Sequence, residues 1–314
     1  MQAIFHYTVS PGLQAKLAAL ESDWLSIADC AEADDARLQA LLPEADVLWH
    51  VLKPVTAEVI AAAPRMRLIQ KIGVGVNTID QEAAQARGIA VCNMPETNSQ
   101  AVAEATLMLM LAALRRATAF HAATAAGDGW RLDAADFDRV GELAGRCVGL
   151  VGHGAVARRL APVLAALGAR VVYTATAPKA DAVAAWRDLP ALLAESDVVS
   201  LHLPLTAGTA GLIDGEAIAA MKPGAVLVNT ARGGLVDEAA LVDALSSGRL
   251  RAAGLDVFAE EPVPAGNPLL KLDNVVLAPH VAWLTPETFD RSLGIAVENS
   301  RRINDGAALL HRVV

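Results

Sequence analysis

The sequence predicts an α/β protein of two domains, each built on a doubly wound parallel sheet of the Rossmann-like or flavodoxin-like type. Short apolar segments alternate with longer Ala- and Leu-rich segments of helical period, as in β-α-β units. This alternation occurs twice, once before residue 98 and again from Cys147 onward. A chain of 314 residues is also long enough for one or two domains with sizeable cores.

The first series predicts a domain over residues 1–98. Strands are expected at Ala3–Tyr7, Leu25–Ala28, Val47–Val51, Leu68–Ile72 and Ile89–Cys92. Helices are expected at Gly12–Glu21, Ala36–Leu42, Ala57–Ala62 and Asp80–Ala86.

A single long helix is predicted next, with Ser99 as its N-cap and Gly127 as its end. The second series follows, with strands expected at Cys147–Val151, Arg170–Thr174, Asp197–Leu203, Ala225–Asn229, Ala252–Val257 and Asn274–Leu277. Six strands in this rhythm match a complete dinucleotide-binding sheet. The last helix, Pro286–Gly306, is expected to return to the first domain. The predicted domains are therefore residues 1–98 plus 285–314, and residues 99–284.

Composition excludes several classes of function. The net charge of −9 and the lack of a Lys/Arg cluster argue against nucleic-acid binding. The longest apolar stretch, Ala105–Leu114, is too short to cross a membrane, and no signal peptide is expected at the N-terminus. Three cysteines without metal-ligand spacing suggest buried free thiols and a cytoplasmic protein, and no metal site is expected.

The run Gly152-His153-Gly154-Ala155-Val156-Ala157 follows a predicted strand and opens a helix. In that context a G-x-G-x-x-A pattern indicates a dinucleotide site. The first glycine allows a tight turn, the second lets the backbone approach the pyrophosphate, and the alanine permits close packing of helix and strand. The N–H groups at the helix start, from Ala155 and Val156, would face the phosphates. His153 is expected to face solvent or cofactor.

The end of the next strand bears on which dinucleotide binds. A site for NAD places an acidic residue there to hold the ribose hydroxyls. This chain has Thr174, Ala175 and Thr176 instead, with Lys179 beyond them. A carboxylate at these positions would repel the 2′-phosphate of NADP(H), and none is present. The sequence therefore favours NADP(H), with NAD(H) as the alternative.

Four polar residues lie at or just beyond the ends of later strands: Arg232, Asp256, Glu261 and His280. The carboxyl ends of parallel strands form the ligand crevice of such a sheet. There an arginine can pair with a substrate carboxylate, and a histidine can supply or take the proton that accompanies hydride transfer. A glutamate can orient the imidazole and favour its charged form. Taken singly, each residue could equally be a surface ion-pair partner or a strand-end residue.

The chain resembles the D-isomer-specific 2-hydroxyacid dehydrogenase family along nearly its whole length. The resemblance rests on "KIGVGVNTID", "GIAVCNMPETNSQAVAE", "VGLVGHGAVA", "LHLPLTAGTAGLI", "GAVLVNTARGGLVDEAAL", "AAGLDVFAEEP" and "NVVLAPHVAW". It implies that Arg232, Glu261 and His280 are catalytic and that residues 99–284 bind NAD(P). It implies a substrate site formed by Val74, Gly75, Arg232, His280 and Trp283.

The motifs described above and the resemblance together imply a set of cofactor-binding residues. That set is Gly152, His153, Gly154, Ala155, Val156, Thr174, Thr176, Lys179, Leu203, Pro204, Thr209, Thr230, Ala231, Arg232, Asp256, His280 and Ala282. Asp256 resembles the residue that hydrogen-bonds the nicotinamide carboxamide. The resemblance also implies a homodimer, formed through residues 101–140.

A short run and a few single residues narrow the range of possible substrates. The run His280 to Trp283 resembles glyoxylate/hydroxypyruvate reductases, which implies a small 2-oxo acid as substrate. His50 stands where phosphoglycerate dehydrogenases carry an arginine, which weakens the case for a phosphorylated acid, although Lys53 is nearby. Glu261 disfavours a formate dehydrogenase. Two alternatives stay open: a larger 2-oxo acid, and a dinucleotide-sensing protein similar to corepressors of this fold.

Overall fold

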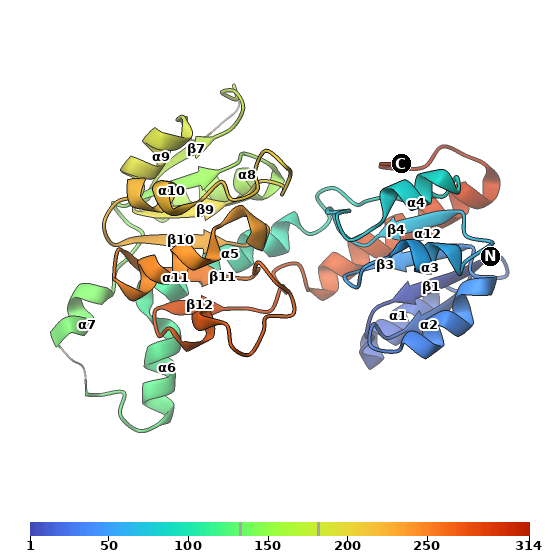
Figure 1. The fold of residues 1–314 in the computed structure, drawn as a ribbon, viewed down its shortest axis with the longest axis horizontal. Coiled ribbons are helices and arrows are strands. Elements are labelled where there is room, and N and C mark those ends of the chain that lie inside the picture. Colours follow the sequence, from blue (N-terminus) through green and yellow to red (C-terminus); the bar gives the residue numbers. More distant parts are fainter. Residues whose placement is uncertain (132–133, 181–182) are drawn as a thin grey trace. The chain divides into compact units, whose positions relative to one another are not determined.

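The structure, a computed structural model, describes residues 1–131, 134–180 and 183–314. These residues form two compact units, one of Met1–Asn98 with Leu284–Val314 and the other of Ser99–Trp283. The second unit is therefore an insertion within the chain of the first (Figure 1). The boundary expected before residue 285 lies one residue beyond the structural one.

The first unit contains a five-stranded parallel sheet in the order β2-β1-β3-β4-β5. This is the flavodoxin-like order, with its switch point between β1 and β3. The strands are β1 (Gln2–His6), β2 (Ser26–Cys30), β3 (Val47–His50), β4 (Leu68–Lys71) and β5 (Ala90–Cys92). The helices are α1 (Pro11–Leu20), α2 (Asp35–Leu41), α3 (Ala57–Ala61), α4 (Gln81–Ala86) and α12 (Pro286–Asp305), with a 3₁₀ turn at Leu42–Glu44.

The second unit contains a seven-stranded parallel sheet in the order β12-β11-β10-β9-β6-β7-β8. The dinucleotide-binding order is embedded in it, with the switch point between β6 and β9. The strands are β6 (Cys147–Val151), β7 (Arg170–Thr174), β8 (Ala185–Trp186), β9 (Val198–Leu201), β10 (Ala225–Asn229), β11 (Leu250–Leu255) and β12 (Val275–Leu277). The helices are α5 (Ser99–Arg115), α6 (Ala117–Ala125), α7 (Ala134–Arg139), α8 (Ala155–Ala166), α9 (Leu189–Glu195), α10 (Gly215–Ala220) and α11 (Glu238–Ser246), with 3₁₀ turns at Gly233–Leu235 and Pro268–Lys271.

Four of the five α-helices of the first unit, and α9, α10 and α11 of the second, begin at a side chain that accepts a hydrogen bond from the backbone three residues on. Asp80 caps α4, Asp214 caps α10 and Asp237 caps α11 in this way, and Thr285 caps α12. Each such cap satisfies an N–H group that the helix itself leaves unpaired. The starts of these helices are therefore fixed locally.

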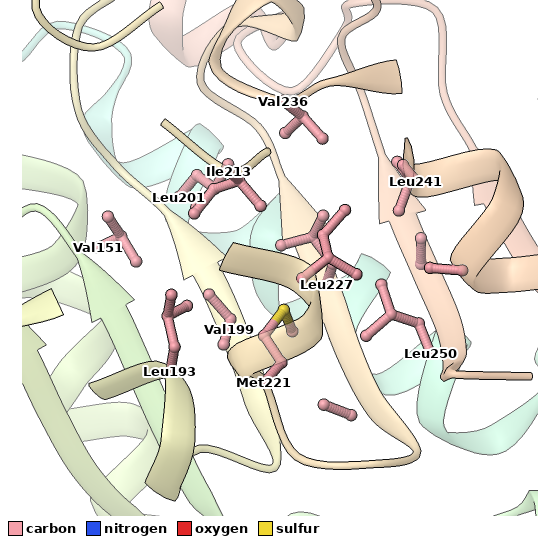
Figure 2. Packing of buried hydrophobic residues seen from close by; sticks show 14 of the residues in the cluster. Val151, Leu193, Val199, Leu201, Ile213, Met221, Leu227, Val236, Leu241 and Leu250 are labelled. Atoms are coloured by element: carbon pink, nitrogen blue, oxygen red, sulfur yellow. The ribbon is translucent and has the colours of Figure 1, made fainter. Parts of the chain in front are cut away.

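The core of the second unit lies on both faces of its sheet, because neighbouring residues of a strand point to opposite faces. In β10, Leu227 packs in the cluster drawn in Figure 2, whereas Val226 and Val228 pack on the opposite face. Burying a leucine or valine side chain stabilises the fold by roughly 1.5–3 kcal/mol. The labelled side chains of Figure 2 are Val151, Leu193, Val199, Leu201, Ile213, Met221, Leu227, Val236, Leu241 and Leu250.

The single long helix expected after Ser99 is wrong. Helix α5 ends at Arg115, and α6 starts after Arg116, whose φ of 50° is left-handed. The guanidinium of Arg116 pairs with Asp136 at 2.6 Å and with Asp273 at 2.9 Å. These ion pairs offset a backbone conformation that costs roughly 1–2 kcal/mol.

Two short elements were not expected, α7 and β8. Strand β8 is two residues long and brings the described sheet to seven strands where six were predicted. Cys30, Cys92 and Cys147 are free and buried. The cytoplasmic location stays a prediction. Within the described residues no helix has the length and apolar content needed to cross a bilayer, and no group of His, Cys, Asp and Glu could hold a metal ion.

Candidate active site

The glycine turn after β6 leaves open space at the start of α8. Gly152 has φ of 100°, and a Cβ there would lie 2.5 Å from the carbonyl oxygen of His202, so no other residue fits without strain. A Cβ on Gly154 would meet no atom closer than that same oxygen at 4.0 Å. Ala155 and Val156 begin α8, and Ala157 is fully buried against the sheet. These residues fit a dinucleotide pyrophosphate at the helix start.

His153 is 8% exposed and stacks on Tyr173, with 4.1 Å between ring centroids. The expectation that it faces solvent is therefore wrong, and the cofactor-facing alternative stays a prediction. At the end of β7 the side chain of Thr174 is partly buried, whereas Thr176 and Lys179 are exposed. The N–H of Lys179 donates to the Tyr173 hydroxyl at 2.6 Å, which fixes the loop after the strand.

The loop after β9 is braced by its own side chains. The hydroxyl of Thr209 accepts from the N–H of Thr206 at 2.8 Å and donates to the carbonyl of Pro204 at 2.7 Å. Leu203 packs against the core below. Burial lowers the pKa of His202 to about 4, so its ring is neutral at pH 7, with Nε2 2.9 Å from Ser200 Oγ. Roles of Leu203, Pro204 and Thr209 in cofactor binding remain predictions.

Arg232 follows β10 in a turn that Asn229 holds. The Asn229 side chain accepts from the N–H of Ala231 at 3.0 Å and donates to the carbonyl of Arg232 at 2.9 Å. The Arg232 guanidinium donates to the Ala231 carbonyl at 2.6 Å. Burial lowers the pKa of Arg232, and the charge of Glu261 opposes that shift. The arginine and the glutamate therefore lie close enough to interact.

Two residues of this turn, Gly233 and Asn229, had not been predicted as part of the site. A Cβ on Gly233 would lie 1.9 Å from the backbone of Phe258, so only glycine lets the Arg232 turn approach the segment that carries Glu261. Asn229 is 1% exposed. An Asn at the last position of a strand was the available sequence signal for it. By contrast, the predicted cofactor residue Thr230 has its hydroxyl 2.7 Å from that of Thr106 in α5.

His280 and Glu261 form a hydrogen-bonded pair, with 2.6 Å between His280 Nδ1 and Glu261 Oε2. The other carboxylate oxygen of Glu261 accepts from the N–H of Phe258 at 2.9 Å. Burial alone would raise the pKa of Glu261, but the hydrogen bonds from His280 and Phe258, with the charges of His280 and Arg232, outweigh it and lower that pKa. The glutamate is therefore an anion that fixes the imidazole and leaves Nε2 for another partner.

Asp256, at the end of β11, holds the loop that carries His280. Its carbonyl accepts from the N–H of His280 at 2.7 Å, and its two carboxylate oxygens accept from the N–H groups of Val281 and Ala282 at 2.8 and 2.9 Å. Burial raises the pKa of Asp256, and those two hydrogen bonds oppose the rise. Asp256 and Ala282 thus have a structural part in the site, while their contact with a cofactor stays a prediction. The indole of Trp283, 8% exposed, donates to the His280 carbonyl at 2.9 Å.

In the first unit, the glycine turn after β4 exposes backbone donors. Gly73 has φ of 141°, and its carbonyl accepts from Met94, while the carbonyl of Val74 accepts from the Asn93 side chain. Among the described residues no group accepts from the N–H of Val74 or Gly75. A turn with outward N–H groups is suited to an anion such as a carboxylate.

Two polar residues at and after the end of β3, the strand next to β4, are already engaged. His50 is fully buried, with Nε2 2.8 Å from Thr78 Oγ1, and burial, followed by Lys71 and His6, lowers its pKa well below the usual value. Lys53 pairs with Asp35 at 2.5 Å and donates to the Glu32 carbonyl at 2.7 Å. His50 is therefore neutral at pH 7, and the charge of Lys53 is partly compensated.

Comparison with known proteins shows which family and which characterised proteins the chain is similar to. The family described as "D-isomer specific 2-hydroxyacid dehydrogenase, NAD binding domain" matches residues 107–282. D-3-phosphoglycerate dehydrogenase of Mycobacterium leprae is 43% identical over 92% of this chain and 54% of its own length. Glyoxylate reductase of Aeropyrum pernix is 41% identical over 82% of this chain and 79% of its own length.

Among solved structures, the TT0316 protein of Thermus thermophilus is similar over the full length of both chains, with a TM-score of 0.87 and 37% identity. The chain spans about half the length of the phosphoglycerate dehydrogenases that it matches. The family match covers more than half of the chain, and it covers most of the run from α5 to the loop of His280. The chain belongs to the D-isomer specific 2-hydroxyacid dehydrogenase family.

Proposed function

We propose that this chain catalyses the reversible reduction of a small 2-oxo acid to a D-2-hydroxy acid, with glyoxylate or hydroxypyruvate as substrate. The observation that carries the proposal is the 2.6 Å pair of His280 and Glu261, close to the guanidinium of Arg232 at the carboxyl edge of the second sheet. An arginine, an imidazole and its acidic partner are what reduction of an oxo acid requires. A protein that only senses dinucleotides does not need all three.

Each residue of the trio has a separate task in this proposal. Arg232 binds the substrate carboxylate and polarises the neighbouring carbonyl. His280 donates a proton from Nε2 to the carbonyl oxygen during reduction and takes it back during oxidation. Glu261 holds the imidazole in place through Nδ1. A bound dinucleotide supplies or accepts the hydride. Val74, Gly75 and Trp283 remain predicted substrate-binding residues.

The closeness of phosphoglycerate dehydrogenases in sequence raises a phosphorylated acid as the competing substrate. The neutral, buried His50 and the compensated Lys53 support an acid without a phosphate. The test is a turnover assay with glyoxylate, hydroxypyruvate, its 3-phosphate and phenylpyruvate. We expect the highest kcat/KM with glyoxylate or hydroxypyruvate. A clear preference for the 3-phosphate or for phenylpyruvate would overturn the substrate assignment, and dinucleotide binding without any turnover would favour the sensor.

We propose NADP(H) as the preferred dinucleotide. No carboxylate stands at Thr174, Ala175 or Thr176, and Thr176 and Lys179 are exposed at the end of β7, where a 2′-phosphate could be met by a hydroxyl and an ammonium group. Paired assays with NADPH and NADH test this, together with Lys179→Gln. We expect a lower KM for NADPH, and the variant should raise that KM while leaving the KM for NADH unchanged. Equal or better use of NADH by the wild type would contradict the preference.

We propose that the chain forms a homodimer through the segment 101–140. The described part of that segment exposes several large apolar side chains, Met108, Leu111, Trp130 and Phe137. Exposed apolar patches of this kind mark protein interfaces. Light scattering on the purified protein should give the mass of two chains, and Trp130→Asp with Phe137→Asp should shift it toward one. A monomeric wild type would exclude the proposal.

A further inference from the structure

The amino-terminal edge of the sheet in the second unit is rich in cations. Since all its strands are parallel, residues that precede or begin them lie along one edge. The backbone confirms this alignment, because the N–H of Arg170 donates to the carbonyl of Arg146, and the N–H of Gly224 donates to that of Arg249. The cations of this edge are Arg146, Arg170, Lys222, Arg249 and Arg251. Such a concentration stands out in a chain with a net charge of −9.

Three of these cations already have partners among the described residues. Arg170 pairs with Glu195 at 2.7 Å, and Lys222 pairs with Asp197 at 2.5 Å. Arg249 donates to backbone carbonyls, one of them that of Ala219 at 2.6 Å. Arg146 and Arg251 differ from them, since no described carboxylate lies within ion-pair distance of either one.

Arg146 and Arg251 converge on Gly141. A Cβ on Gly141 would lie 2.5 Å from Nη2 of Arg146 and 3.2 Å from Nη1 of Arg251, so these nitrogens are at most about 6 Å apart. Arg146 uses its Nε for the carbonyl of Glu142 at 2.7 Å. In Arg251, Nε and Nη2 are buried and have no hydrogen-bond partner in the described structure. Buried donors are nearly always satisfied in proteins, which points to an acceptor from outside the chain.

The electrostatics of this pair favour an anion. Burial and the charge of Arg146 lower the pKa of Arg251, so the folded chain holds two cations together at a cost. Asp197 opposes the shift. Its carboxylate is shared, however, because one oxygen accepts from Lys222 and the other from the N–H of Cys147 at 2.8 Å. An oxyanion between the guanidinium groups would turn this repulsion into two attractions.

We propose that Arg146 and Arg251 form a binding site for a small oxyanion such as inorganic phosphate. Guanidinium groups present paired N–H donors that match the oxygen atoms of such an ion. The site lies at the amino end of β6, whereas the glycine turn follows its carboxyl end, so a five-residue strand, about 16 Å long, separates the two. The acidic chain around it and the small number of converging donors favour a small ion over a nucleic acid.

The test measures binding of inorganic phosphate to the full chain by calorimetry at constant ionic strength, with and without saturating dinucleotide. The dinucleotide fills the other anion site, so phosphate that still binds reports this one. We expect saturable binding of one phosphate per chain in its presence. Arg251→Gln and Arg146→Gln should each weaken that binding by about tenfold or more, because each removes charged hydrogen bonds. Arg170→Gln is the matched control on the same edge, and it should bind phosphate like the wild type.

Thermal unfolding provides an independent readout. Without phosphate, Arg251→Gln should unfold at the same temperature as the wild type or higher, because it removes a like-charge contact. With phosphate, the wild type and Arg170→Gln should gain more stability than Arg251→Gln. If Arg251→Gln does not fold, Arg251→Lys replaces it in the test. Lysine keeps the positive charge but lacks the planar, paired N–H donors of the guanidinium group, so this variant should bind phosphate more weakly than the wild type. Absence of saturable binding to the wild type with dinucleotide present, or undiminished binding by the folded variants, would overturn the proposal.

Discussion

At His280 the backbone takes part in placing the imidazole. The residue has φ of 57°, a conformation that only a few per cent of non-glycine residues adopt. Asp256 holds it there through its carbonyl and carboxylate, and the indole of Trp283 holds the carbonyl of His280. Glu261 then fixes the ring. Backbone and side chain are thus restrained separately, which is how a proton donor is kept in one orientation.

Removing either member of the pair should slow catalysis with little effect on dinucleotide binding. We expect His280→Ala to lower kcat by about 10²–10⁴, the usual contribution of general acid–base catalysis. Glu261→Gln should lower kcat less, because the amide can still orient the ring through Nδ1 although it carries no negative charge. Steady-state kinetics and dinucleotide titration measure both effects. A wild-type kcat in His280→Ala would remove it from the mechanism.

The lowered pKa of Glu261 also predicts how stability depends on pH. A carboxylate whose pKa is depressed by folding stabilises the protein above its unfolded-state pKa, and this contribution is lost as the pH falls through the folded-state value. The difference in melting temperature between the wild type and Glu261→Gln should therefore be largest near neutral pH and shrink in acid. Thermal unfolding over a pH series measures it, and a difference independent of pH would contradict this account.

At the scale of an element, the turn between β6 and α8 assigns different tasks to its two glycines. Gly152→Ala introduces a Cβ 2.5 Å from a carbonyl oxygen at a left-handed φ, so it should destabilise the fold by roughly 2 kcal/mol or more. Gly154→Ala meets open space and should unfold like the wild type, yet it should bind dinucleotide more weakly if the pyrophosphate lies there. Denaturation and dinucleotide titration separate the two. Unchanged affinity in Gly154→Ala would place the phosphates elsewhere.

The elements show which parts of the structure were accessible from the sequence alone. Strands with short apolar runs and the Gly152 turn could be predicted because their signals are local. The break at Arg116 could not, since helical periodicity continues past it and the ion pairs that hold it come from Asp136 and Asp273. The role of Gly233 depends on the approach of a distant segment at Phe258, whereas the Asn229 side chain bonds to the nearby backbone of Ala231 and Arg232. Patterns among neighbouring residues do not indicate contacts between segments that are distant in the sequence.

At the scale of the whole chain, the predicted ligands of the substrate belong to different units. Arg232 and His280 lie in the second, and Val74 and Gly75 lie in the first. Hydrogen exchange tests the two sets separately. Dinucleotide alone should slow exchange at the start of α8, and added oxalate should slow it at the amides of Val74 and Gly75, because a carboxylate would accept from them. Unprotected amides at Val74 and Gly75 would remove these residues from the predicted substrate site.

The insertion of one unit within the other has a consequence for synthesis on the ribosome. Trp49 in β3 donates to Ser300 in α12, and Asn299 of the same helix donates to Gln70 in β4. These partners are translated only after all of Ser99–Trp283 has been synthesised. Residues 1–98 therefore lack the partners of the Trp49 indole and of the Gln70 carbonyl oxygen until α12 has been made. Residues 99–283 have their complete sequence before then and can fold first.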